Sequence, residues 1–172
     1  QLTEKEQILL TKDPTSNVKA LKHYFLGRAY FGSASKQENN LSRKMYLRAI
    51  ELDPEYAQAY ASLALTHIDD ARRGWVSDPE ESIKQAFKLA RQAISINDTI
   101  PQAHFTLGYI HLYTKGEHNR AIEAAKRAIE LDPNYPDGYA LLSSAYFFSG
   151  QPEKSLPLDR KAMRLNPVAS FM

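Results

Sequence analysis

The sequence predicts an all-α protein in which four helical hairpins stack into a right-handed superhelical solenoid. Three observations support this fold class: a pattern recurs four times, each copy spaces its large residues as one face of a helix does, and each copy ends at a turn residue. The turn residues are Pro54, Asp98, Pro133 and Pro167, and the last two intervals are 35 and 34 residues long. Proline ends a helix because it lacks the N–H donor and clashes with the preceding turn.

The first helix of each predicted hairpin carries a Leu that is followed by a small residue. The four pairs are Leu26-Gly27, Leu63-Ala64, Leu107-Gly108 and Leu142-Ser143. A His or Tyr stands three positions before each Leu and four positions after it. These spacings place the large side chains on one helical face, and the small residue lets a second helix approach closely.

The second helix of each predicted hairpin carries a small residue and, seven positions later, an alanine. The pairs are Ser42 and Ala49, Ala86 and Ala93, Ala121 and Ala128, and Ser155 and Ala162. Seven residues are about two helical turns, so both small residues face the first helix. The predicted helix pairs are 17–34 with 38–52, 56–73 with 79–96, 101–114 with 117–130, and 136–149 with 152–165.

The domain organisation follows from the repeats. We expect an N-terminal extension or linker over 1–16, repeat units over 17–54, 55–98, 99–133 and 134–167, and the start of a truncated further repeat over 168–172. The chain begins at Gln1 rather than at a methionine, so we expect it to be part of a longer protein. An insertion in the second repeat carries Trp75, which is the sole tryptophan of the sequence.

Composition and motifs exclude several functions. The net charge of +2 gives no case for nucleic-acid binding, and no apolar run is long enough to insert into a membrane. The sequence has no phosphate-binding glycine loop, no His-Glu-x-x-His and no Gly-x-Ser-x-Gly. His104 and His111 are separated by about 10 Å along one helix, too far apart for one metal ion. We therefore predict no enzyme, no catalytic residues, no metal site and no cofactor.

The repeat pattern resembles the tetratricopeptide repeat (TPR) over residues 17–167. The same string, Ile-Glu-Leu-Asp-Pro, ends the second helix at 50–54 and at 129–133. The resemblance implies a protein-interaction scaffold that binds a peptide or helix in a concave groove lined by the first helices. At the groove positions the residues that we expect to bind the partner are Tyr24, Arg28, Phe31, Leu65, Phe105, Tyr109, Tyr113 and Phe147.

The third repeat carries a second apolar face on its first helix. Phe105, Tyr109, Leu112 and Tyr113 centre on a face about 140° from the one that packs the hairpin. Exposed contiguous apolar surface marks contact sites. Two interpretations stay open: a groove for a partner, or packing against adjacent first helices or a helix outside this sequence. TPR proteins that bind the C-terminal tail of a chaperone hold its carboxylate with several cations at groove positions. At the corresponding positions of this sequence Arg28 is the one cation, so we do not predict binding of a chaperone tail.

A finer resemblance concerns the whole protein. Four segments carry it, namely 17–30, Arg72-Arg73-Gly74-Trp75, Asp78-Pro79-Glu80-Glu81 and 162–167. They look like the C-terminal TPR region of bacterial signalling proteins, where it follows a class III adenylate or guanylate cyclase domain or a winged-helix domain. The resemblance implies, as the alternative function, a cytoplasmic regulatory or oligomerisation arm, with a protein or peptide partner or a second copy of the chain bound to it.

Overall fold

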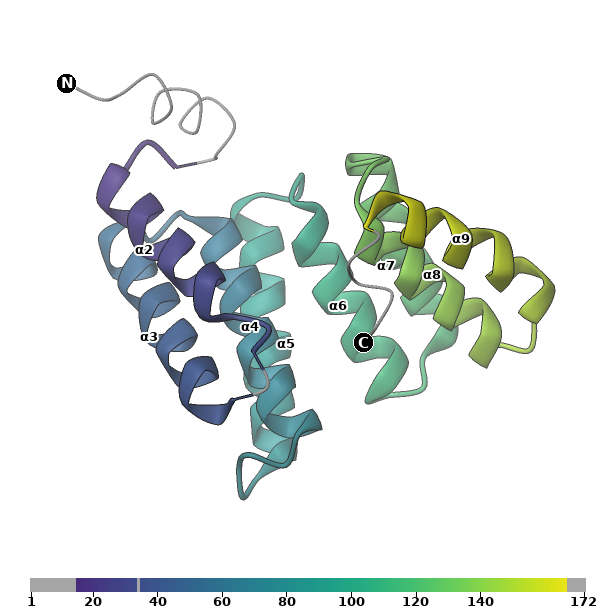
Figure 1. Ribbon diagram of the computed structural model, residues 1–172, viewed down its shortest axis with the longest axis horizontal. Helices are drawn as coiled ribbons and strands as arrows, with labels where there is room; N and C mark the ends of the chain where they lie inside the picture. The colour runs from purple at the N-terminus through teal and green to yellow at the C-terminus, as the bar shows by residue number, and fades with distance from the viewer. Residues whose placement is uncertain (1–14, 34, 167–172) are drawn as a thin grey trace. The chain divides into compact units, whose positions relative to one another are not determined.

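The computed structural model describes residues 15–33 and 35–166, and within these ranges every regular element is a helix (Figure 1). The chain divides into two compact units, residues 1–98 and 99–172, each of which is described by itself. Most of the predicted N-terminal extension and the predicted start of a further repeat at 168–172 lie outside the described residues. The all-α fold class is confirmed, and the superhelical handedness stays a prediction.

The first unit contains two antiparallel hairpins. Helix α2 (Val18–Tyr30) pairs with α3 (Lys36–Leu52), α4 (Ala57–Arg72) pairs with α5 (Pro79–Ile96), and α3 packs against α4. Asn17 starts α2, because its side-chain oxygen accepts from the backbone N–H groups of Lys19 and Ala20. Helix α2 ends four residues earlier than predicted, since Phe31 already has an extended backbone.

The second unit repeats the arrangement. Helix α6 (Pro101–Tyr113) pairs with α7 (His118–Leu131), and α8 (Pro136–Phe148) pairs with α9 (Ser155–Leu165), which follows a short 3-10 turn at Pro152–Lys154. Helix α8 also packs against α7 and α6 (Figure 1). Prolines stand at the first position of α6 and α8, where a missing N–H costs no helical hydrogen bond.

Close approach of the paired helices depends on the predicted small residues. A Cβ added at Gly27 would lie 2.6 Å from the Tyr46 ring of α3, and one added at Gly108 would lie 3.0 Å from the Ala124 side chain of α7. The Ser42 hydroxyl donates to the Gly27 carbonyl across the first hairpin at 2.9 Å. The alanines Ala49, Ala93 and Ala128 are fully buried. These contacts confirm that small side chains set the spacing of the helices.

A buried polar network joins α3 to α4. Arg43 Nη2 lies 2.6 Å from Asp70 Oδ2, and Asn39 Nδ2 donates to Asp70 Oδ1 at 2.8 Å. Both side chains also donate to the Thr66 carbonyl, at 3.0 and 2.9 Å. Because the Asp70 side chain is 3% exposed, its charge depends on these partners, and loss of one partner would leave it uncompensated. Nothing in the sequence pattern predicted this network.

His67 lies beside the network on α4. Its pKa is lowered to about 4, mainly by burial and also by the Arg43 charge, while the Asp70 charge opposes both effects. The imidazole is therefore neutral at pH 7 in the folded protein.

We expect acid to destabilise the first unit through His67. Its pKa is lower in the folded than in the unfolded chain, so the unfolded chain binds the proton preferentially and folding stability falls between pH 6.5 and about 4. His67→Gln removes this contribution. Urea unfolding at about pH 7.5 and about pH 4.5 checks it: the free energy of unfolding should fall less with pH in the variant than in the wild type. An equal fall in both would contradict the assignment.

Candidate partner-binding surface

The structure separates the eight predicted partner-binding residues into two groups. Tyr24, Arg28, Phe31 and Leu65 belong to the first unit. Tyr24 is 2% exposed and its ring lies 5.1 Å from that of Tyr56, so it is a core residue and cannot contact a partner. Position in the repeat predicted a groove site, but the rings of Tyr46 and Tyr56 pack against Tyr24 and bury it. Arg28 is exposed, with its guanidinium 5.9 Å from the Phe25 ring, and Phe31 and Leu65 are half-buried.

Aromatic rings of the second unit form one connected series, which we call the aromatic ladder. It consists of Tyr135, Phe105, Tyr109, Tyr113, Phe148 and Phe147, in order of contact. Successive ring centroids are 6.0, 6.1, 4.5, 6.1 and 5.6 Å apart, within the range of favourable aromatic pairs. The ladder contains four of the predicted partner-binding residues.

Local helix geometry builds the ladder. Phe105, Tyr109 and Tyr113 are each four residues apart on α6, so they lie one above the other on a single face. Phe147 and Phe148 end α8, and Tyr135 precedes its first residue. The predicted set omitted Tyr135 and Phe148. Phe148 occupies a groove position of the fourth repeat, so the repeat register could have found it, whereas Tyr135 lies in a turn and had no such signal.

Exposure increases along the ladder. Phe105 and Tyr109 are half-buried and pack against the core of the second unit, which includes Leu112, Leu141 and Leu142. At the other end Tyr113 is 47%, Phe148 53% and Phe147 59% exposed. The inner rings therefore support the core, and the outer three rings present apolar surface to solvent. A partner groove at these rings stays a prediction.

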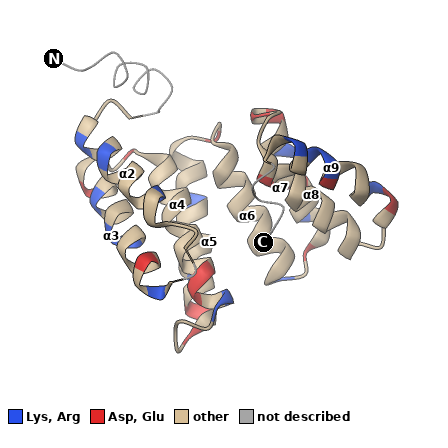
Figure 2. Cartoon of the chain, in the orientation of Figure 1, with Lys and Arg blue, Asp and Glu red and all other residues tan. Residues whose placement is uncertain are grey.

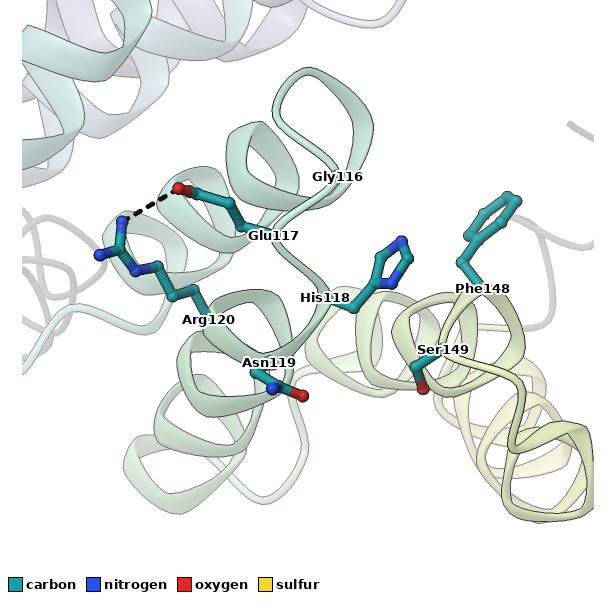
Figure 3. A pocket seen from close by; sticks show the side chains of 7 residues that line it. All are labelled: Gly116, Glu117, His118, Asn119, Arg120, Phe148 and Ser149. Carbon is teal, nitrogen blue, oxygen red and sulfur yellow. Dashed lines mark hydrogen bonds and ion pairs between the residues drawn. The ribbon is translucent and has the colours of Figure 1, made fainter.

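A shallow cavity of about 460 Å³ adjoins the exposed end of the ladder (Figure 3). Its lining comes from the α6–α7 turn, the start of α7 and the end of α8, namely Gly116, Glu117, His118, Asn119, Arg120, Phe148 and Ser149. Figure 3 shows the His118 and Phe148 side chains extending toward the same space, whereas those of Glu117 and Arg120 extend to the other side. The exposed end of the ladder therefore borders a cavity with a partly polar lining.

Ionic contacts hold the turn beside this cavity. His111 Nδ1 donates to Glu117 Oε2 at 2.5 Å, and Arg120 Nη1 lies 3.1 Å from the other carboxylate oxygen. The hydrogen bond from His111 lowers the pKa of Glu117 most, the Arg120 and Lys115 charges add to it, and desolvation opposes them. Glu117 is therefore an anion that ties the end of α6 to the start of α7.

Other kinds of site find no support in the described residues. No group of three or more His, Asp or Glu side chains in residues 15–33 and 35–166 could hold a metal ion. No helix in the same ranges is long and apolar enough to cross a membrane. The surface offers contact area, ring faces and a few polar groups, which suits binding.

Comparisons with known proteins agree with this fold. Residues 111–150 match the TPR repeat family. The structure is similar to a thermophilic TPR protein of Thermus thermophilus, with a TM-score of 0.71, 19% identity, and coverage of 95% of this chain and 80% of that one. It is also similar to the first TPR of Spaghetti bound to an HSP90 peptide, with a TM-score of 0.59, 17% identity, and coverage of 79% and 97%. These likenesses concern the fold.

One curated relative matches part of the sequence. It is a putative adenylate cyclase 3 of Rhizobium meliloti, 36% identical over 77 residues, which are 45% of this chain and 13% of the relative. The chain therefore spans a small part of that protein's length. Together these findings show a TPR repeat at residues 111–150 and the fold of TPR proteins. The resemblance to winged-helix regulators stays a prediction.

We expect the two ends of the ladder to respond differently to truncation. Phe105→Ala should destabilise the protein by about 2–4 kcal/mol, because a half-buried ring leaves a gap beside the core. Phe148→Ala should cost less than about 1 kcal/mol, because most of its ring contacts solvent. Urea unfolding of both variants checks this, and an equal loss of stability would mean that the exposed end also supports the core.

Proposed function

We propose that this chain is a protein-interaction module that binds a peptide or helix of a partner protein on the outer rings of the aromatic ladder. One observation carries the proposal: the Phe148 ring contacts both Tyr113 and Phe147, all three are about half exposed, and Phe148 lines a cavity. The common role of TPR proteins supports the same conclusion.

Physical chemistry favours these rings as the binding centre. An aromatic side chain offers a large apolar area with few rotatable bonds, so a partner buries much surface while little rotamer entropy is lost. The inner rings pack on the core and thereby hold the outer ones in place before the partner arrives. Clustered, supported aromatic residues are the usual energetic centres of protein interfaces.

The remaining predicted residues receive subordinate roles in the proposal. Phe105 and Tyr109 support the outer rings and contribute their accessible edges. In the first unit we propose Arg28, Phe31 and Leu65 as additional contacts. Arg28 is exposed and its guanidinium presents several donors, so it would orient an acidic group of the partner.

The proposal predicts that Tyr113→Ala combined with Phe148→Ala abolishes partner capture and preserves folding. Both rings are about half exposed, so the helical circular dichroism signal and the unfolding midpoint should change little. Affinity purification from cells of the source, with quantification of the retained proteins, is the measurement. The matched control is Leu156→Ala with Met163→Ala, which removes two comparably exposed apolar side chains from α9 of the same unit. A partner retained equally by the ladder variant and the wild type would overturn the proposal.

A second candidate function is a cytoplasmic regulatory or oligomerisation arm of a larger bacterial signalling protein. The observation that favours it is the 36% identity with part of a putative adenylate cyclase. If the complete gene encodes a cyclase, the Tyr113→Ala and Phe148→Ala pair should change cyclase activity in the full-length protein by at least about threefold, a modest coupling between the arm and the catalytic domain. Unchanged activity and unchanged oligomeric state would leave the arm without a regulatory role.

A further inference from the structure

Charge is distributed unevenly along this chain. Residues 15–52, which form the α2–α3 hairpin, contain seven Lys and Arg but two Glu, a net charge of +5. The whole chain carries +2, so all other residues together carry −3. Figure 2 shows Lys and Arg along both helices of this hairpin. The near-neutral net charge of the whole chain therefore includes one clearly basic hairpin.

Intramolecular ion pairs neutralise part of this charge. Arg43 pairs with buried Asp70 at 2.6 Å, and Arg48 pairs with Glu51 at 2.7 Å. Lys36 donates instead to the backbone carbonyl of Trp75, which is a neutral acceptor, so its charge is not cancelled. Lys44 is exposed and forms no ion pair with any residue in the described ranges.

These two lysines belong to one hollowed surface, which we call the basic face of α3. A shallow cavity of about 460 Å³ is lined there by Lys36, Gln37, Asn40, Leu41 and Lys44. Lys36, Asn40 and Lys44 are one turn apart on the helix, so the lysines are separated by about 12 Å along the axis. Between them lie two amide side chains and a half-buried leucine, and no acidic side chain lines the cavity.

We propose that the basic face of α3 is a second docking surface, which takes an acidic helical segment of a partner protein. Carboxylates two turns apart on such a segment match the spacing of Lys36 and Lys44. The amides of Gln37 and Asn40 supply directional hydrogen bonds to carboxylates, and Leu41 supplies apolar contact. This charge complementarity steers association and fixes the register of the partner.

Other occupants fit this surface less well. The cavity has no aromatic lining on which nucleic-acid bases could stack, and its amides favour a partner with fixed acceptors over a fluid lipid surface. A second copy would have to supply exposed acids, such as those at the start of α5. There Asp78 accepts the backbone N–H of Glu81, and the Glu81 side chain contacts Lys84 and Gln85, so both acids are already engaged.

The test uses a fluorescein-labelled helical peptide of four Glu-Glu-Ala-Leu repeats, titrated with the whole chain and followed by fluorescence anisotropy at about 50 mM salt, where charge screening is weak. Lys36→Glu combined with Lys44→Glu should weaken peptide binding at least about tenfold, because two attractive contacts become repulsive. The matched control is Lys84→Glu with Lys88→Glu, two exposed lysines one turn apart on α5, which changes the net charge equally. The control should change the affinity less than about twofold.

Four outcomes would overturn the proposal. The first is equal weakening by both variants, and the second is no binding of the peptide at all. The third is binding of phosphatidylserine vesicles but not of the peptide, lost in the Lys36→Glu and Lys44→Glu variant. The fourth is concentration-dependent dimerisation of the wild type that the same variant abolishes. Circular dichroism confirms that both variants fold. None of these outcomes bears on the aromatic ladder, because the ladder lies in the other unit.

Discussion

Close contact between the two helices of each hairpin is the constraint on which the rest of the structure depends. At Gly27 and Gly108 even one additional carbon atom would collide with a side chain of a neighbouring helix. Small serines use the same proximity to form hydrogen bonds between helices, as Ser42 does with Gly27 and Ser143 with Ser155. Alanines are accordingly numerous among the buried apolar residues, and large side chains such as Tyr24, Tyr46 and Ile110 complete the core.

The position of the aromatic ladder follows from this close helix packing. The face of α6 that carries Gly108 packs the hairpin, so the large rings of α6 are directed elsewhere. Phe105 and Tyr109 reach the core that α6 shares with α8, and Tyr113, one turn further on, extends past it. The same row of residues therefore packs against the core of the unit at one end and presents exposed apolar surface at the other.

The two units differ in where their polar side chains form networks. In the first unit Arg43, Asn39 and Asp70 form a buried network between hairpins, with His67 neutral beside it. In the second unit His111, Glu117 and Arg120 close the α6–α7 turn near the surface. A basic helix face in the first unit and an aromatic ladder in the second would allow one small protein to contact chemically different segments.

The sequence by itself determined the helices, their pairing and the repeat register, because small and large residues recur at fixed helical spacings and prolines mark the turns. It also located Phe105, Tyr109 and Tyr113 on a second apolar face and Phe147 at a groove position of the fourth repeat. Tertiary structure alone decided which groove positions are accessible: Tyr24 occupies the same kind of position as Phe105 but is enclosed by Tyr46 and Tyr56. The spacing of residues in a sequence describes one helix at a time. Burial depends on the neighbouring helix and on which of its side chains come within reach, and so do the Arg43–Asp70 pair and the Tyr113–Phe148 contact.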